Sequence, residues 1–155
     1  MAVSARLNRF LHHHRVLAVD TMVLAYHLQE HPRYAPATRG ILKSWEGGSH
    51  RGVTSVLTLA EVLVKPLRDG DHVAAAEYRR VLTRLPNLRF LDVGLDIAQT
   101  AARLRAAHGL ALPDAVQMAT ALAGGATGFI SNDPEFKRVK DVEVLLLDEV
   151  VPARR

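Results

Sequence analysis

Four acidic residues follow short apolar segments of the sequence, at points where strands are expected to give way to helices. Asp20 ends the first segment, Glu61 lies in the helical stretch after the second, and Asp114 opens a later helix beside a proline. Asp133 closes a Ser-Asn-Asp sequence at the end of another apolar segment. If the strands run parallel, these carboxylates face one edge of a sheet. There they repel one another and raise one another's pKa unless a cation lies among them.

The ligand chemistry of such a cluster selects the cation. Carboxylate oxygens in a chain that has no cysteine favour Mg²⁺ or Mn²⁺ over zinc. These ions act on phosphate esters by polarising a phosphoryl oxygen and generating a hydroxide-like nucleophile. The sequence therefore predicts phosphodiester chemistry at a metal site formed by Asp20, Glu61, Asp114 and Asp133. Each acid alone also has a structural interpretation, as a helix cap or as a charge favoured by the helix dipole.

The balance of charge indicates an anionic substrate. The chain has 20 basic and 16 acidic residues, and 16 of the basic residues are arginine, whose forked guanidinium suits phosphate oxygens. Genome base composition is an equally good explanation for the arginines. Setting the 4 site acids aside leaves 12 acidic residues against the 20 basic ones. An acidic, metal-filled pocket inside a basic surface suits a nucleic-acid backbone.

Five short apolar segments alternate with helix-like stretches, which is typical of an α/β domain with a mainly parallel sheet. The predicted strands span 15–20, 52–56, 88–93, 127–131 and 142–148. The predicted helices span 21–30, 35–47, 57–67, 71–85, 95–109 and 113–125. In such sheets ligands bind beyond the carboxyl ends of the strands, which is where the four acids stand.

Length and composition predict one domain across residues 1–155, of which 1–14 form an N-terminal extension. Hydrophobic residues make up 48% of the chain, which is enough for a core. No apolar run reaches the roughly 20 residues of a membrane span. The lack of cysteine suits a reducing compartment, so we expect a cytoplasmic protein with no membrane partner.

The order of these motifs resembles the PIN-domain ribonucleases, in particular the VapC toxins of VapBC-type toxin–antitoxin pairs. The matching stretches are VLAVDTMVLAYHL, VTSVLTLAEVLVKPL, LALPDAVQMATALAGGATGFISNDPEF and VEVLLLDE, which cover about residues 15–150. The resemblance implies a PIN-like three-layer fold, in which helices flank a mainly parallel five-stranded sheet.

The resemblance also implies the activity, a metal-dependent endoribonuclease that hydrolyses RNA phosphodiester bonds as the toxin of a toxin–antitoxin system. Asp20, Glu61, Asp114 and Asp133 fall on the family's acidic quartet, as catalytic residues and ligands of Mg²⁺ or Mn²⁺. Ser131 falls where the family has Thr or Ser, a hydroxyl that helps to organise the site. The implied partners are an RNA substrate, a cognate antitoxin and a second copy of the chain in a homodimer.

Two other enzyme classes also end their first strand in Asp. A haloacid-dehalogenase-like phosphatase requires a second Asp where Met22 stands. A receiver domain requires an acidic pair before Asp20, where Val19 stands, and a Lys after the last strand, where Glu149 stands. The remaining alternative is a catalytically inactive PIN-like binding module, whose acids only cap helices and whose stability does not respond to Mn²⁺.

The consecutive His12, His13 and His14 invite a metal site. Successive residues of a helix point about 100° apart, however, so three in a row cannot share one face. We expect an exposed, partly cationic segment there instead. Trp45 stands alone on an apolar helical face and is expected in the core or at an interface.

Overall fold

A computed structural model describes residues 4–153. Its strands form one parallel five-stranded sheet in the order β3-β2-β1-β4-β5. The strands are β1 (Val16–Val19), β2 (Arg51–Ser55), β3 (Leu88–Leu91), β4 (Gly128–Ser131) and β5 (Glu143–Leu146). The predicted α/β fold class is confirmed.

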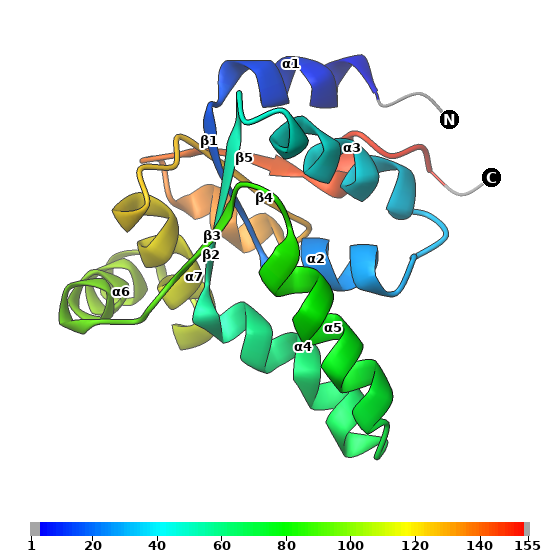
Figure 1. Ribbon diagram of the computed structural model, residues 1–155. Coiled ribbons are helices and arrows are strands. Elements are labelled where there is room, and N and C mark those ends of the chain that lie inside the picture. Colours follow the sequence, from blue (N-terminus) through cyan, green and yellow to red (C-terminus); the bar gives the residue numbers. More distant parts are fainter. Residues whose placement is uncertain (1–3, 154–155) are drawn as a thin grey trace.

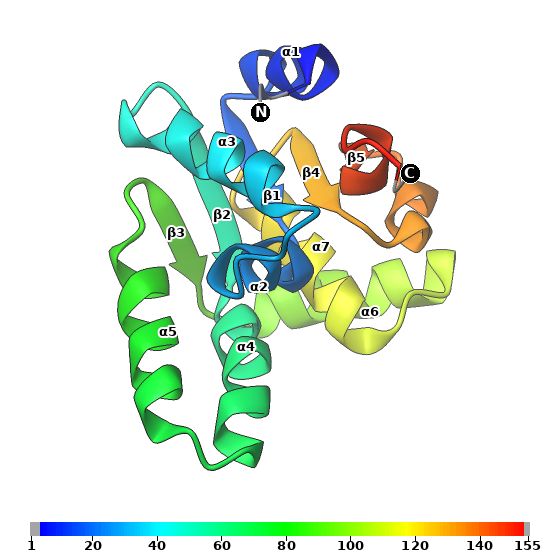
Figure 2. The same cartoon turned by 90° about the vertical axis from the view of Figure 1, so that its right-hand side faces the viewer.

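Helices cover both faces of the sheet and complete a three-layer structure (Figure 1). One face carries α1 (Ala5–His13), α2 (Thr21–Leu28) and α3 (Ala35–Glu46), and the other carries α6 (Leu95–His108) and α7 (Leu112–Ala123). The helices α4 (Val56–Arg68) and α5 (His72–Arg84) pack against each other and project beyond the sheet (Figure 2). Two short 3₁₀ helices, η1 (Pro134–Arg138) and η2 (Leu147–Glu149), flank β5.

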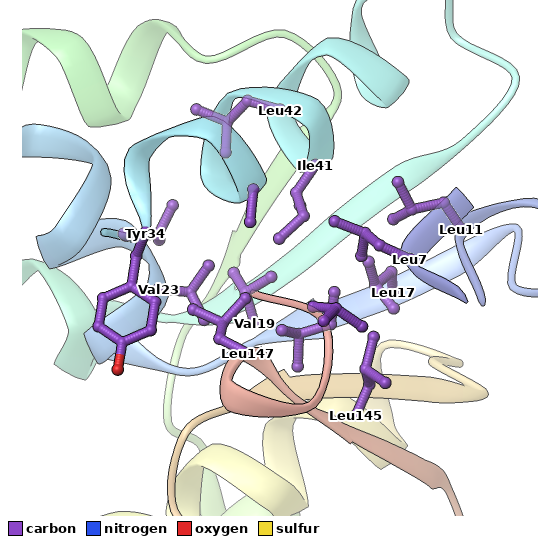
Figure 3. Close-up of a cluster of buried hydrophobic side chains, with 14 of the residues drawn as sticks. Leu7, Leu11, Leu17, Val19, Val23, Tyr34, Ile41, Leu42, Leu145 and Leu147 are labelled. Atoms are coloured by element: carbon purple, nitrogen blue, oxygen red, sulfur yellow. The ribbon is translucent and has the colours of Figure 1, made fainter. Parts of the chain in front are cut away.

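The central strand β1 is buried on both sides, because successive side chains of a strand point to opposite faces. Leu17 and Val19 join the cluster under α1, α2 and α3, which Figure 3 shows together with Leu145 and Leu147. Ala18 joins the second cluster, which lies under α6 and α7. Burial on both sides holds the end of β1, and therefore Asp20, in a fixed position.

Two helices begin one residue earlier than predicted. Thr58 and Glu61 have the spacing of a capping box, which would make Glu61 a structural residue, but α4 begins at Val56 with Ser55 as its N-cap. Thr58 and Glu61 therefore lie inside the helix. The helix α7 begins at Leu112, so the proline that follows it is the second helical residue and not the first.

Within residues 4–14 the N-terminal extension is a helix packed on the core; its His12 and His13 are exposed as expected, and residues 1–3 lie outside the described part. Ser4 caps α1 by accepting a hydrogen bond from the backbone N of Leu7. Leu7, Phe10 and Leu11 are buried against the core. His14, expected at the surface, is only 4% exposed. The apolar face of α1 accounts for the difference, because residues i, i+3 and i+4 share one side of a helix.

Within residues 4–153, none of the helices combines the length and the apolar character that a membrane span requires.

Candidate active site

The strand order places a topological switch point between β1 and β4. The chain leaves β1 toward β2 on one side, and leaves β4 toward β5 on the other side. At such a switch point the connections diverge beyond the carboxyl ends of the strands, and ligands bind there in open α/β sheets. Asp20 follows β1 directly, and Ser131 and Asp133 lie at and just beyond the end of β4.

Hydrogen bonds tie the ends of β1 and β4 together. Asp20 is 7% exposed; its Oδ1 accepts from the backbone N of Thr21 at 2.7 Å, which caps α2. Its Oδ2 accepts from Ser131 Oγ at 2.8 Å. The Ser131 Oγ in turn accepts from the backbone N of Asp133 at 3.0 Å. The hydroxyl of Ser131 therefore fixes the positions of two acids that are far apart in the chain.

A carboxylate cluster lies beside this chain of hydrogen bonds. Asp114, Asp133 and Glu135 each offer one oxygen within 4.8 Å of the other two. Asp133 also caps η1, because its Oδ1 accepts from the backbone N of Glu135 at 2.9 Å. Glu135 was not predicted as a site residue. The sequence indicates it only indirectly. Glu135 follows Asp133 by two residues within the turn that Asp133 caps, so the turn brings the two side chains close together.

Glu61 joins the site through a polar network that was not predicted either. Its Oε1 accepts from Thr21 Oγ1 at 3.1 Å and from Gln117 Nε2 at 3.4 Å. Gln117 is 3% exposed and also donates to Thr58 Oγ1 at 3.0 Å. It follows Asp114 by three residues, so both side chains lie on one face of α7. The sequence signal for this network was a single glutamine, Gln117, among the apolar residues of α7.

The acids interact through their charges as well as through hydrogen bonds. Burial raises the pKa of Asp20 from 3.8 to about 6; the charges of Asp114 and Glu61 add to the rise, and the hydrogen bonds from Ser131 and Thr21 oppose it. Burial also raises the pKa of Asp114, with further contributions from the charges of Asp133, Glu61 and Glu135. Charge interactions therefore link Asp20, Glu61, Asp114 and Asp133, with Glu135 as a fifth acid, whereas the oxygens set closest together belong to Asp114, Asp133 and Glu135. The catalytic and metal-binding roles of these residues stay a prediction.

The donor set fits a hard divalent cation. The acids present carboxylate oxygens, and neither histidine nor cysteine belongs to the group of Asp114, Asp133 and Glu135. These three side chains are half-buried and Glu61 is exposed, so the site opens to solvent. Mg²⁺ and Mn²⁺ prefer oxygen ligands, and Mg²⁺ keeps several waters when it binds. Asp114, Asp133 and Glu135 are the closest-set candidate ligands, and Asp20 and Glu61 lie outside that closest group.

The sequence matches the model of the PIN domain over residues 17–142, which is most of the chain. This chain belongs to the PIN-domain family. The chain matches none of the curated proteins.

Solved structures share the architecture of this PIN domain. VapBC2 from Rickettsia felis, bound to promoter DNA, is 15% identical with a TM-score of 0.65, and the match covers 84% of this chain and 98% of that one. VapC20 of Mycobacterium tuberculosis, a toxin that cleaves the sarcin-ricin loop, is 20% identical with a TM-score of 0.65, covering 88% and 99%. VapBC-1 from nontypeable Haemophilus influenzae is 21% identical with a TM-score of 0.65, covering 86% and 98%. At these identities the similarity establishes the fold alone.

The raised pKa of Asp20 predicts how the stability of the metal-free PIN domain depends on pH. The unfolded chain loses this proton near pH 3.8 and the folded chain near pH 6, so the folded state binds more protons between these values. Stability attributable to Asp20 therefore falls as pH rises from about 4 to about 6, and the full penalty, about 3 kcal/mol, is present above pH 6.

Urea unfolding of the wild type and of Asp20→Asn, in EDTA between pH 4 and 7.5, measures this contribution. Other titrating groups are common to both proteins, so the difference in unfolding free energy isolates Asp20. The variant should gain stability relative to the wild type as pH rises through this window. A difference that does not change with pH would show that Asp20 is not a destabilising buried charge.

Proposed function

We propose that this PIN domain is a Mg²⁺- or Mn²⁺-dependent endoribonuclease and the toxin of a toxin–antitoxin pair. The observation that carries the proposal is the convergence of Asp20, Ser131 and Asp133 with Asp114 and Glu135 at the switch point of the sheet. Helix capping explains one oxygen each of Asp20 and Asp133. It does not explain why Asp114, Asp133 and Glu135 crowd together, so an inactive module whose acids only cap helices is the weaker interpretation.

Each residue has a role in the proposed hydrolysis. Asp114, Asp133 and Glu135 would hold the cation, Asp20 would lie beside them as a further ligand, and Ser131 keeps the carboxylate of Asp20 in place. When bound, the cation polarises a phosphoryl oxygen of the RNA backbone and supplies a nucleophile at neutral pH. Glu61 is exposed and its Oε1 is held by Thr21 and Gln117, so its second oxygen is available to orient an attacking water.

The neighbours support the partners that we assign. VapC20 is described as a toxin that cleaves the sarcin-ricin loop, which supports an RNA substrate. VapBC2 and VapBC-1 are toxin–antitoxin systems of the same fold, which supports a cognate antitoxin. We further expect the chain to act in the cytoplasm and to form a homodimer.

The test of this function is cleavage of purified total RNA by the full chain. We expect cleavage with Mg²⁺ or Mn²⁺ that stops in EDTA, and a loss of at least about 100-fold in Asp114→Asn, because one contributor to electrostatic catalysis is typically worth about 10²–10³ in rate. The matched control is Asp96→Asn, an exposed aspartate in the first turn of α6, which should cleave like the wild type.

Two results would contradict the proposal. Undiminished cleavage by Asp114→Asn would remove this carboxylate from the mechanism. A wild-type chain that neither cleaves RNA nor gains thermal stability with Mn²⁺ would favour the inactive binding module, since an ion that binds only the folded state raises the melting temperature.

A further inference from the structure

A second group of metal-ligating side chains lies at the amino ends of the strands, at the opposite end of the sheet from the acids. We propose that His13, His14 and Glu143 form a Zn²⁺-binding site. His14 precedes β1 and Glu143 is the first residue of β5, whereas the acids follow the carboxyl ends of the strands. The site is therefore separate from the proposed nuclease centre, and the inference does not depend on that function.

The three side chains already converge. Each offers one ligand atom, and these atoms lie within 4.8 Å of one another. His14 Nε2 is 2.8 Å from Glu143 Oε2. The rings of His13 and His14 lie edge to face, with centroids 4.9 Å apart.

The two histidines share a site because the helix ends between them. The rule that successive helical residues point about 100° apart applies only while the helix continues. The helix α1 ends at His13, and His14 has an extended backbone, with φ of −115° and ψ of 106°. The sequence argument against a site in this histidine run therefore does not apply to His13 and His14, which stand at and just beyond the end of the helix. It holds for His12, which is exposed and whose Nδ1 instead bonds to the backbone O of Asn8.

His14 is oriented as a metal-bound histidine usually is. Without metal, its Nε2 donates a hydrogen bond to Glu143 Oε2 at 2.8 Å, and Nδ1 lies 2.8 Å from Thr127 Oγ1. A bound metal would replace the proton on Nε2, and Nδ1 would then donate to the hydroxyl of Thr127. An outer partner of this kind commonly fixes the tautomer and ring orientation of metal ligands. The ring is also packed tightly, because a Cβ at Gly128 would lie 2.7 Å from its Cγ. The first ligand is therefore preorganised by the fold.

The ligand set selects the metal. Two imidazoles and one carboxylate suit Zn²⁺, which binds nitrogen and oxygen in tetrahedral sites and keeps an open position where the protein supplies three ligands. The hard ions proposed for the acidic site prefer oxygen alone. Because the two sites differ in their donor atoms, one chain can hold one kind of ion at the amino ends of its strands and another kind at their carboxyl ends.

The surroundings favour an anion at the open position. A cavity of about 430 Å³ is lined by His13 and Glu143 together with Arg6 and Arg9. Arg6 also pairs with Glu149 at 3.5 Å. Two guanidinium groups near the ion weaken the binding of a bare cation, and they attract chloride, hydroxide or a phosphate oxygen as the fourth ligand. A filled site would join the end of α1 to the edge strand β5.

Calorimetric titration of the full chain with Zn²⁺ tests the site. The titration is done in the Asp114→Asn background, so that the acidic cluster competes less. We expect His13→Ala and Glu143→Gln each to weaken Zn²⁺ binding by at least about 10- to 100-fold, the range that loss of an outer-shell partner alone produces. Both side chains are exposed, so these variants keep the fold, which circular dichroism without metal verifies.

The matched control is His12→Ala, which removes the neighbouring exposed imidazole and should leave the affinity unchanged. With Co²⁺ in place of Zn²⁺, the visible absorption of a tetrahedral site should appear in the control and be lost in Glu143→Gln. Equal Zn²⁺ affinities of His12→Ala, His13→Ala and Glu143→Gln would overturn the proposal, as would binding that depends only on the carboxylates of the nuclease site.

Discussion

Replacing Asp20 by Asn is expected to lower RNA cleavage about 100- to 1000-fold while making the metal-free protein more stable. The loss of activity follows because the substitution removes a charge from the electrostatic centre, where a single contributor is typically worth about 10²–10³ in rate. The gain in stability follows because the ionised carboxylate is buried, with a pKa raised to about 6.

The hydrogen bonds around position 20 allow this substitution without unfolding. An Asn can accept from the backbone N of Thr21 as Asp20 does, and its amide can donate to the hydroxyl of Ser131, which has a second lone pair. Single-turnover cleavage and urea unfolding of the same preparation measure the two effects.

Asp71→Asn is the control for this experiment. Asp71 caps α5 by accepting from the backbone N of Ala74, but it is exposed and far from the site in the sequence. Since Asn caps helices as well as Asp, both rate and stability should stay at wild-type values. If Asp20→Asn cleaves normally, Asp20 is no part of the chemistry. If it loses the fold together with the activity, Asp20 is mainly a structural cap.

The largest expected effect on stability is that of Trp45→Ala. The side chain of Trp45 is fully buried between α3 and the sheet, and loss of a buried Trp typically costs about 3–5 kcal/mol. Its Nε1 has no hydrogen-bond partner in the described part of the chain, so Trp45→Phe removes an unpaired polar atom and should cost less than Trp45→Ala. Trp45 is the single tryptophan, so circular dichroism and not fluorescence should follow unfolding.

A substitution at Gly52 tests the contact between the Trp45 ring and the backbone of β2. A Cβ at Gly52 would lie between 2.6 and 2.8 Å from three atoms of the Trp45 ring, so Gly52→Ala should cost about 1–3 kcal/mol by overpacking. In the Trp45→Ala background that cost should largely vanish, because the ring is gone. Additive changes in unfolding free energy in the double variant would mean that positions 45 and 52 are not in energetically significant contact.

Much of the fold was predictable because its strands are short apolar runs between amphipathic helices. The segment of β1 is typical of a strand buried on both faces, and such strands occur in parallel sheets. The acids could be placed together for the same reason, since the carboxyl ends of parallel strands share an edge. This rule was enough for Asp20, which follows β1 directly, and for Asp133, which lies two residues beyond the end of β4.

The supporting residues of the site were not predictable in the same way. Gln117 reaches Glu61 only because α7 is rotated to bring it over α4, and a sequence pattern contains no information on that rotation. Glu135 joins the cluster through a turn that its own neighbour caps. The helix α1 did leave a signal in the sequence, because Leu7, Phe10 and Leu11 follow the capping Ser4 at helical spacing.

The order of the strands has a consequence for folding of the chain during its synthesis on the ribosome. The strand β1 is made early, yet its neighbour β4 is made late, and 111 positions separate Asp20 from the Ser131 that holds it. Contacts so distant along the chain cannot form until the second partner has been translated. A nascent chain therefore carries no assembled acidic centre until residues 131–135 have been made, so the proposed nuclease activity can appear only after most of the chain has been translated.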